Sequence, residues 1–328
     1  MRTRTLHIPT IHTHHASPSQ PSSTKRKSPH HHTSHQRSPI TSAHPSTSTP
    51  PPHPQIDLII TDVDGTLLDS KQELSPVVKK AVSTAATAGI PLVLATGKAI
   101  GPWAHTILPQ LDTRMPQIFI QGLLIRDYEQ GIIYQRCLED EVLHTSINFA
   151  KRKGLTLIAY LGDRIICDRT DEHTDRLSFY NEPTPEQVGD LSQIVGKLSI
   201  YKLIFMAQEE KIHEIREDAH AVLSNTASLT TALPGMLEVL PLGASKGAGV
   251  EWLLQQRLGI HPSRCMAIGD GENDIEMLKL CGWGVAMGNA GVAVKRVASA
   301  VVGTNDEHGV AEAIEKYVLQ PRGVTCFG

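Results

Sequence analysis

The stretch Asp57–Asp69, which reads DLIITDVDGTLLD, joins a short apolar run to a group of carboxylates. The apolar run is typical of a buried parallel strand. Because side chains two apart in an extended chain point to the same side, Asp62 and Asp64 should converge where this strand ends. Ligands of open α/β sheets bind at that edge. Two close carboxylates repel each other unless a proton or a cation intervenes, and Mg²⁺ prefers such oxygen ligands.

The residues that follow predict a crossover to a second parallel strand. Ser75 suits a helix N-cap, Pro76 suits the first helical position, and Gly89 suits the C-terminal stop. An apolar strand follows at residues 91–95. Strand, helix and parallel strand make one right-handed unit of a doubly wound sheet.

The second strand ends at Thr96 and Gly97, which Lys98 follows. A hydroxyl and a glycine amide at a strand's carboxyl end can both donate to a phosphoryl oxygen, although an ordinary strand-end turn has the same sequence. A P-loop is excluded, because that motif needs glycine and a hydroxyl residue where Leu92 and Ala99 stand.

Two later segments place charged residues at helix starts. Lys246 opens a predicted helix, where the helix dipole disfavours a cation, so the residue either holds an anion or is a solvated surface lysine. Asp270, Asn273 and Asp274 follow the apolar strand 265–269. Their spacing puts all three on one face of a helix start, where carboxylates are favoured.

These four motifs, in this order, resemble those of the haloacid dehalogenase (HAD) superfamily. From residue 56 to about 319 the chain is similar to the Cof-type, class IIB phosphatases. The resemblance implies a phosphoric monoester phosphatase that acts on a small phosphorylated metabolite, such as a sugar phosphate or a nucleotide- or cofactor-like phosphate. It also implies that Asp62 attacks phosphorus and that Asp64 is the general acid and base.

The resemblance further assigns binding residues. Phosphoryl oxygens are held by Thr96, Gly97, Lys246 and Asn273. The cofactor Mg²⁺ is held by Asp62, the backbone carbonyl of Asp64 and Asp270, with Asp274 close by or in the outer shell. Gln121 and Lys98 stand where related proteins usually have Asn and Arg, and both differences bear on substrate recognition.

The spacing of the motifs locates an inserted domain. About 20 residues separate Asp69 from Leu92, whereas about 150 separate Thr96 from Lys246, so the insertion lies in the longer interval. The prediction is an α/β fold: a doubly wound, parallel-sheet HAD core with an inserted α+β cap domain of the C2 type. The core is assigned to residues 56–122 and 237–320, and the cap to residues 123–236.

Composition limits the possible partners. The formal net charge is −3, so no overall field favours nucleic acid. No apolar run approaches the roughly 18 residues that span a bilayer, so no membrane segment is expected. The expected partner is the small phosphorylated substrate, with neither nucleic acid nor a membrane, and the sequence leaves the oligomeric state open.

Residues 1–55 differ in composition from the rest of the chain. They contain six basic residues, no Asp or Glu, and many Ser, Thr, Pro and His residues. Such a segment buries too little apolar surface to fold, and its composition is typical of an organelle transit peptide. We therefore expect a disordered leader that directs the protein to the plastid or chloroplast. The alternatives are a mitochondrial targeting signal, or a cytoplasmic protein whose N-terminal tail carries no targeting signal.

Three other functions share some of these features. A phosphomutase or phosphotransferase would use the same nucleophile but return the phosphoryl group. A P-type ATPase needs membrane helices, which the sequence lacks. A non-catalytic phosphometabolite-binding protein would not need Asp62, Asp64, Lys246 and Asp270 together. Phosphate release in an assay with Mg²⁺ distinguishes these possibilities.

Overall fold

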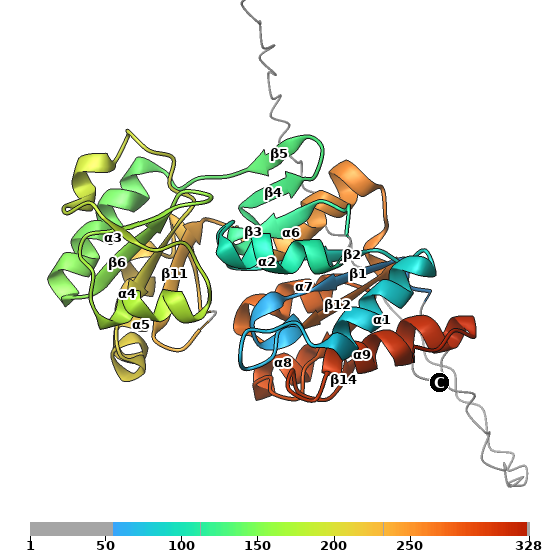
Figure 1. Ribbon diagram of the computed structural model, residues 1–328. Coiled ribbons are helices and arrows are strands. Elements are labelled where there is room, and N and C mark those ends of the chain that lie inside the picture. Colours follow the sequence, from blue (N-terminus) through green and yellow to red (C-terminus); the bar gives the residue numbers. More distant parts are fainter. Residues whose placement is uncertain (1–54, 112, 232, 327–328) are drawn as a thin grey trace, which may run out of the picture. The chain divides into compact units, whose positions relative to one another are not determined.

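The computed structural model describes residues 55–111, 113–231 and 233–326 (Figure 1). The leader assigned to residues 1–55 therefore lies outside the described residues, apart from Gln55. No helix within the described ranges combines the length and the apolar character needed to cross a membrane.

The core sheet has five parallel strands in the order β14–β13–β12–β1–β2. The strands span Leu58–Thr61 (β1), Leu92–Leu94 (β2), Cys265–Gly269 (β12), Trp283–Ala286 (β13) and Ala300–Val301 (β14). All four residues of β1 are buried, as a strand covered on both faces requires. The strand predicted from the Asp57–Asp69 stretch is thus a central strand of the sheet.

Helices cover both faces of this sheet, and the alternation of side chains decides which residues they meet. Ile59, for example, belongs to the apolar cluster on one face, which includes Val82 of α1, while Ile60 belongs to the cluster on the other face, which includes Val250 of α6. The first face carries α1 (Pro76–Thr87), α2 (Pro102–Leu111) and α9 (Gly309–Ile314), and the second carries α6 (Lys246–Leu253), α7 (Ile275–Leu280) and α8 (Val292–Val297). The doubly wound α/β core is confirmed.

A second, six-stranded sheet of mixed direction has the order β10–β11–β9–β6–β7–β8. Its strands span Thr156–Tyr160 (β6), Ile165–Cys167 (β7), Glu186–Gln187 (β8), Lys202–Met206 (β9), Ala227–Thr230 (β10) and Met236–Pro241 (β11). One face packs against α3 (Asp140–Lys153) and α5 (Glu209–Leu223), whereas α4 (Glu172–Phe179) packs on the other. This α+β unit is the inserted cap, so the predicted fold class is confirmed.

Two strands lie in sheets other than those expected from the sequence. The segment 237–240, expected to resume the core, pairs as part of β11 with β9 and β10 of the cap sheet. The segment 131–135, expected in the cap, is β5 (Gly131–Gln135) of a small antiparallel sheet with β3 (Gln117–Phe119) and β4 (Leu124–Asp127). The pairing of a strand depends on distant partners, which a local apolar pattern does not specify.

The start of α6 is held against the core by two glycines. Gly122, with φ of +86°, lies so close to α6 that a Cβ on Gly249 would be 2.5 Å from its Cα atom. Only residues without side chains allow this approach, and α6 is the helix that begins with Lys246. The contact therefore fixes where that lysine lies.

We expect Gly249→Ala to lower the free energy of unfolding by about 1–3 kcal/mol, because overpacking forces the backbone apart. The phosphatase activity expected from the sequence should fall further than the loss of stability alone explains, since α6 shifts together with Lys246. Urea unfolding and phosphate release measure the two effects. Gly291→Ala is the matched control, because a Cβ there meets no atom within 4 Å. A Gly249→Ala protein as stable and active as the control would contradict this view of the contact.

Candidate active site

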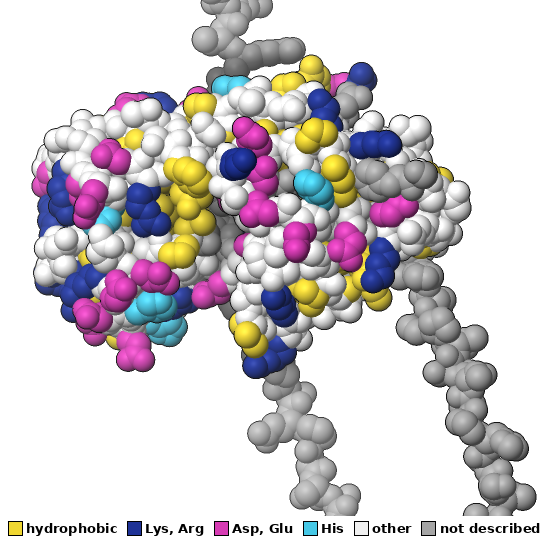
Figure 2. All heavy atoms as spheres, turned by 60° about the horizontal axis from the view of Figure 1, so that its bottom comes forward, with side chains coloured by type: hydrophobic (Ala, Val, Ile, Leu, Met, Phe, Trp, Pro, Cys, Tyr) yellow, Lys and Arg dark blue, Asp and Glu magenta, His cyan; other side chains and the backbone are white. Residues whose placement is uncertain are grey.

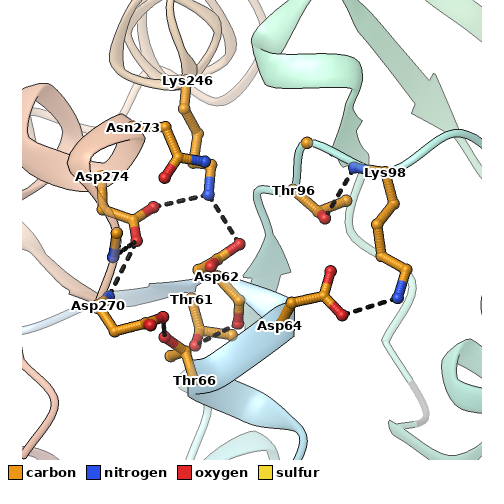
Figure 3. Close-up of polar contacts among 12 residues, drawn as sticks. Thr61, Asp62, Asp64, Thr66, Thr96, Lys98, Lys246, Asp270, Asn273 and Asp274 are labelled. Atoms are coloured by element: carbon orange, nitrogen blue, oxygen red, sulfur yellow. Dashed lines mark hydrogen bonds and ion pairs between the residues drawn. The ribbon is translucent and has the colours of Figure 1, made fainter. Parts of the chain in front are cut away.

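The ends of the core strands bring the charged residues together. Asp62 directly follows β1, Asp270 directly follows β12, and the Asp62 amide donates to the Ile268 carbonyl at 3.0 Å. These neighbouring strands are parallel, so their carboxyl ends meet at one edge of the sheet. Figure 3 shows the resulting group of side chains. Asp62 is 6% exposed and Asp274 is fully buried.

Lys246 connects two of the carboxylates. Its Nζ donates to Asp62 Oδ1 at 2.7 Å and to Asp274 Oδ1 at 2.6 Å (Figure 3). The other oxygen of Asp274 accepts from the backbone amides of Asp270 and Gly271, each at 2.9 Å. Asp274 therefore fixes both the lysine and the loop that carries Asp270.

Asp270 accepts hydrogen bonds from residues that follow two other strands, β1 and β13. The Thr66 hydroxyl donates to Asp270 Oδ1 at 2.6 Å. Asn289 Nδ2 donates to the Gly65 carbonyl at 2.8 Å and to Asp270 Oδ2 at 3.3 Å. Gly65 has φ of +72°, and a Cβ there would lie 2.5 Å from Asp270 Oδ2. The glycine thus allows the loop to turn directly beside this carboxylate.

Burial raises the proton affinity of two of these acids, Asp62 and Asp270. Burial, reinforced by repulsion from Asp274, raises the pKa of Asp62 well above its ordinary value. The same two causes raise the pKa of Asp270 to about 7. Burial opposes the charge of Lys246, but attraction to Asp274 and Asp62 outweighs it and raises the pKa of this lysine. One lysine thus faces three carboxylates.

These carboxylates fit a divalent cation. Asp62, Asp270 and Asp274 each offer an oxygen, and these oxygens lie within 4.8 Å of one another. An all-oxygen donor set suits a hard cation, and a positive charge here would offset both the burial and the repulsion that raise the pKa values of Asp62 and Asp270. The structure therefore supports a divalent metal site.

Asp64 lies in a different environment. Its Oδ1 accepts from Lys98 Nζ at 2.8 Å, and its carboxylate points away from the three metal-type acids (Figure 3). Lys98 also donates to Gln72 Oε1 at 3.3 Å and lies 5.4 Å from the ring centroid of Trp103. The sequence identified Lys98 as a departure from the family pattern, but nothing in it indicated the ion pair with Asp64.

The other predicted phosphate-binding residues surround the same space. The Thr96 hydroxyl accepts from the Lys98 amide at 3.1 Å, which leaves its proton available to another acceptor. Asn273 Nδ2 donates to Gln121 Oε1 at 3.1 Å. Gln121 is fully buried, and its Nε2 has no hydrogen-bond partner among the described residues.

A cavity of about 240 Å³ opens over the carboxyl edge of the core sheet. Its core wall includes Asp62, Asp64, Gly97, Asp270 and Asn273. Its other wall comes from the cap and includes Tyr160, Phe179, Glu182, Lys202 and Glu238. Lys246 and Asp274 are absent from this lining, since both are buried beneath it.

The sequence analysis missed several residues of this site. Thr66 and Asn289 touch Asp270, and each lies in a short motif, after β1 and β13 respectively, that could have indicated them. The cap residues Lys202 and Glu238 had no such signal, because single charged residues in apolar strands identify no partner, and neither did Glu182, which lies in the loop after α4. Only the fold brings them to the cavity.

Comparison with known proteins identifies the family. Residues 59–314 match the family of haloacid dehalogenase-like hydrolases, and the chain belongs to it. The cap is inserted between β2, which ends at Leu94, and α6, which begins with Lys246, and the fold matches that of a subclass IIB HAD structure. The protein is a class IIB HAD phosphatase, an enzyme that hydrolyses phosphoric monoesters of metabolites.

The chain is similar over about four fifths of its length to several named proteins. A putative phosphatase of Streptococcus pyogenes is 30% identical, and the aligned region covers 80% of this chain and 99% of the relative. The chloroplastic endoribonuclease YBEY of Arabidopsis thaliana is 37% identical over 81% of this chain, but the chain spans about half (47%) of that protein's length. A crystal structure of a haloacid dehalogenase-like hydrolase from Bacteroides thetaiotaomicron is 30% identical, covering 80% of this chain and 99% of that one, with a TM-score of 0.71.

On the face of the molecule drawn in Figure 2, acidic and basic side chains are interspersed. The charges seen there do not form a basic track of the kind that follows a nucleic-acid backbone.

The carboxylate cluster predicts how stability depends on pH. Without a divalent cation, the folded protein should become less stable as pH rises from about 4 through about 7. Asp270 has a pKa of about 7 in the folded protein against an ordinary value of 3.8, so the folded state binds this proton more tightly. Thermal unfolding in EDTA at several pH values measures the effect.

Added Mg²⁺ should reverse this trend, because the cation competes with protons for the carboxylates. In EDTA, Asp270→Asn should show a flatter pH dependence than the unmodified protein. If the two proteins respond to pH alike, the raised pKa of Asp270 is not what couples stability to pH.

Proposed function

We propose that this enzyme is a Mg²⁺-dependent phosphatase that hydrolyses a small phosphorylated metabolite through an aspartyl-phosphate intermediate. The observation that carries the proposal is the pair of carboxylates that line one cavity in different environments. Asp62 lies 2.7 Å from Lys246 among the metal-type acids, whereas Asp64 lies 2.8 Å from Lys98. Two acids in different surroundings can serve as nucleophile and as proton carrier.

In the first step, an oxygen of Asp62 attacks phosphorus and the bond to the leaving oxygen breaks. Asp64 gives its proton to the leaving alkoxide, so the alcohol departs neutral. Lys246 offsets the negative charge that gathers on the transferring group. The covalent product of this step is the phosphorylated Asp62.

In the second step, water attacks the phosphorus of the aspartyl-phosphate. Asp64, now ionised, takes a proton from that water, and Asp62 is released as a carboxylate with inorganic phosphate. The same residue therefore gives a proton in one step and takes one in the other. A phosphomutase would instead return the phosphoryl group to an acceptor.

We assign the phosphoryl-binding role to Thr96, Gly97, Lys246 and Asn273. Thr96 offers its hydroxyl proton, Gly97 its amide, and Asn273 its side-chain amide, while Lys246 supplies charge. Gly97 and Asn273 line the cavity directly. Donors of this kind, fixed before the substrate arrives, stabilise developing charge with little reorganisation.

We assign Mg²⁺ as the metal, held by Asp62, Asp270 and the backbone carbonyl of Asp64, with Asp274 adjacent. When bound, this cation supplies positive charge next to the phosphoryl oxygens. Asp274 also ties Lys246 to the loop of Asp270, so it organises the site whichever shell it occupies.

The cap, assigned by sequence to residues 123–236, is proposed to select the substrate, with strand β11 (Met236–Pro241) added to it because β11 pairs with β9. A cavity of about 240 Å³ suits a small leaving group such as a sugar or part of a nucleotide or cofactor. A cap that covers the site also excludes water from the reacting groups.

The two proposed roles predict different mutant behaviour. Asp62→Asn should abolish turnover of every substrate, because its amide cannot form the intermediate. Asp64→Asn should lower the turnover of an alkyl phosphate by roughly 10²–10⁴-fold. The loss with an aryl phosphate should be smaller, since an aryl leaving group needs less protonation. Phosphate release from both substrates, with Mg²⁺ present, measures this.

Asp218→Asn is a control for the charge change, because Asp218 is an exposed cap residue paired with Lys153. Its activity should equal that of the unmodified enzyme. Turnover by Asp62→Asn, or equal losses on both substrates in Asp64→Asn with metal affinity unchanged, would refute these roles.

We also propose that the protein is imported into plastids. Residues 1–55 have the composition of a transit peptide, and the Arabidopsis relative is named as chloroplastic. A fluorescent protein fused after residue 60 should accumulate in plastids, and replacing the six basic residues with Gln should leave it in the cytosol. Fluorescence in mitochondria, or in the cytosol for the unmodified fusion, would contradict the proposal.

A further inference from the structure

Three charged side chains belong to the cap wall of the active-site cavity. Lys202 comes from β9, Glu238 from β11 and Glu182 from the loop after α4. Their exposed fractions are 1%, 3% and 7%, so all three are buried. They play no part in the transfer steps described above, which use only core residues.

The strands explain why these residues share a wall with apolar neighbours. In the cap sheet, Tyr160 of β6 pairs with Lys202, and Ile204 pairs with Glu238. Alternate residues of β9 and β11 turn to this face, so Lys202 and Glu238 lie beside Ile204 and Met236. The opposite face of the same strands packs against α3 and α5.

A buried ion pair is seldom the most stable filling for such a wall. Removing two charges from water costs about as much as their attraction returns, and apolar replacements are often equally stable. Lys202 Nζ nevertheless donates to Glu238 Oε1 at 2.7 Å. The stability of the fold therefore does not explain why Lys202 and Glu238 are present. A role for their polar atoms in ligand binding is the alternative explanation.

The hydrogen bonds of this cluster leave one atom without a partner. Lys202 Nζ also donates to the Gly97 carbonyl at 2.8 Å and lies 4.3 Å from the ring centroid of Tyr160. Glu182 accepts from the Tyr160 hydroxyl at 3.2 Å and from the Ala99 amide at 3.1 Å. Glu238 Oε2 is buried and has no partner among the described residues.

A buried carboxylate oxygen without a donor is costly, and a ligand that supplies a donor regains that cost. Glu238 lies in the cap wall of the cavity whose core wall holds Asp62, so a phosphoester bound at Asp62 would extend its leaving group toward this residue. A ligand O–H group can donate a hydrogen bond to this oxygen, whereas a second anionic group on the ligand is repelled by Glu238 and by the nearby Glu182.

We propose that Glu238 is a specificity-determining residue that accepts a hydrogen bond from a hydroxyl of the leaving group. The preferred substrates are then phosphate monoesters of neutral polyols or sugars. Monoesters whose far end carries a carboxylate or a second phosphate are disfavoured. This inference rests on the proposed function, because it places the phosphoryl group beside Asp62.

The test compares three phosphates with six-carbon chains. Sorbitol 6-phosphate carries hydroxyls, hexyl phosphate carries none, and 6-phosphogluconate ends in a carboxylate. Affinities are measured by calorimetry with Mg²⁺ in the full-length Asp62→Asn protein, in which no turnover interferes. Sorbitol 6-phosphate should bind at least about tenfold more tightly than either other ligand.

Glu238→Gln should then weaken sorbitol 6-phosphate binding by roughly 10- to 100-fold, the value of one hydrogen bond to a charged group. The single amide oxygen stays with Lys202, which leaves an NH₂ group facing the substrate hydroxyl. Hexyl phosphate should bind within about twofold of its earlier affinity, which also shows that the variant is folded. Binding of 6-phosphogluconate should improve.

Glu217→Gln, on the exposed side of α5, is the matched control and should leave all three affinities unchanged. Equal weakening of sorbitol 6-phosphate and hexyl phosphate by Glu238→Gln overturns the inference, as does a preference for 6-phosphogluconate. Phosphate release by the unmodified enzyme is measured separately. Its absence would refute the proposed function, whereas the binding series alone decides the role of Glu238.

Discussion

The contact between Lys246 and the carboxylates of Asp62 and Asp274 is the constraint on which the rest of the site depends. Three acids whose oxygens lie within 4.8 Å of one another cannot all be ionised in a buried place without positive charge. The lysine, at 2.7 and 2.6 Å from two of them, supplies one charge. A divalent cation would supply the remainder. The burial and mutual repulsion of these acids therefore favour the binding of a metal ion at this edge of the sheet.

The parallel sheet makes this arrangement possible. Asp62 and Lys246 are 184 positions apart in the sequence, yet β1 and the helix after the cap deliver them to one edge. The close packing of Gly122 on Gly249 fixes how near α6 lies to the core, and so fixes the position of its first residue, Lys246. The chemistry therefore depends on backbone contacts that carry no functional group.

Much of the core could be predicted from the sequence, because each motif combines a local apolar pattern with polar residues that mark where the strand ends or the helix begins. The N-cap predicted at Ser75 is present, with its hydroxyl accepting from the Val78 amide. The placement of β11 could not be read, since an apolar run such as 237–240 fits either sheet and only its partners β9 and β10 decide. The ion pair of Asp64 with Lys98 was equally hidden, because it depends on the path of two loops rather than on spacing.

The charged residues of the core and those of the cap affect a bound substrate in different ways. In the core, an excess of acids attracts a cation, which in turn suits the dianionic phosphate. In the cap, Lys202 is already neutralised by Glu238, so the cap offers a substrate acceptors rather than net positive charge. A phosphate group is therefore directed to the core end of the cavity and excluded from the cap end. The orientation of a monoester follows from this division, because only one of its ends is an anion, and the neutral end meets the wall that holds Glu238.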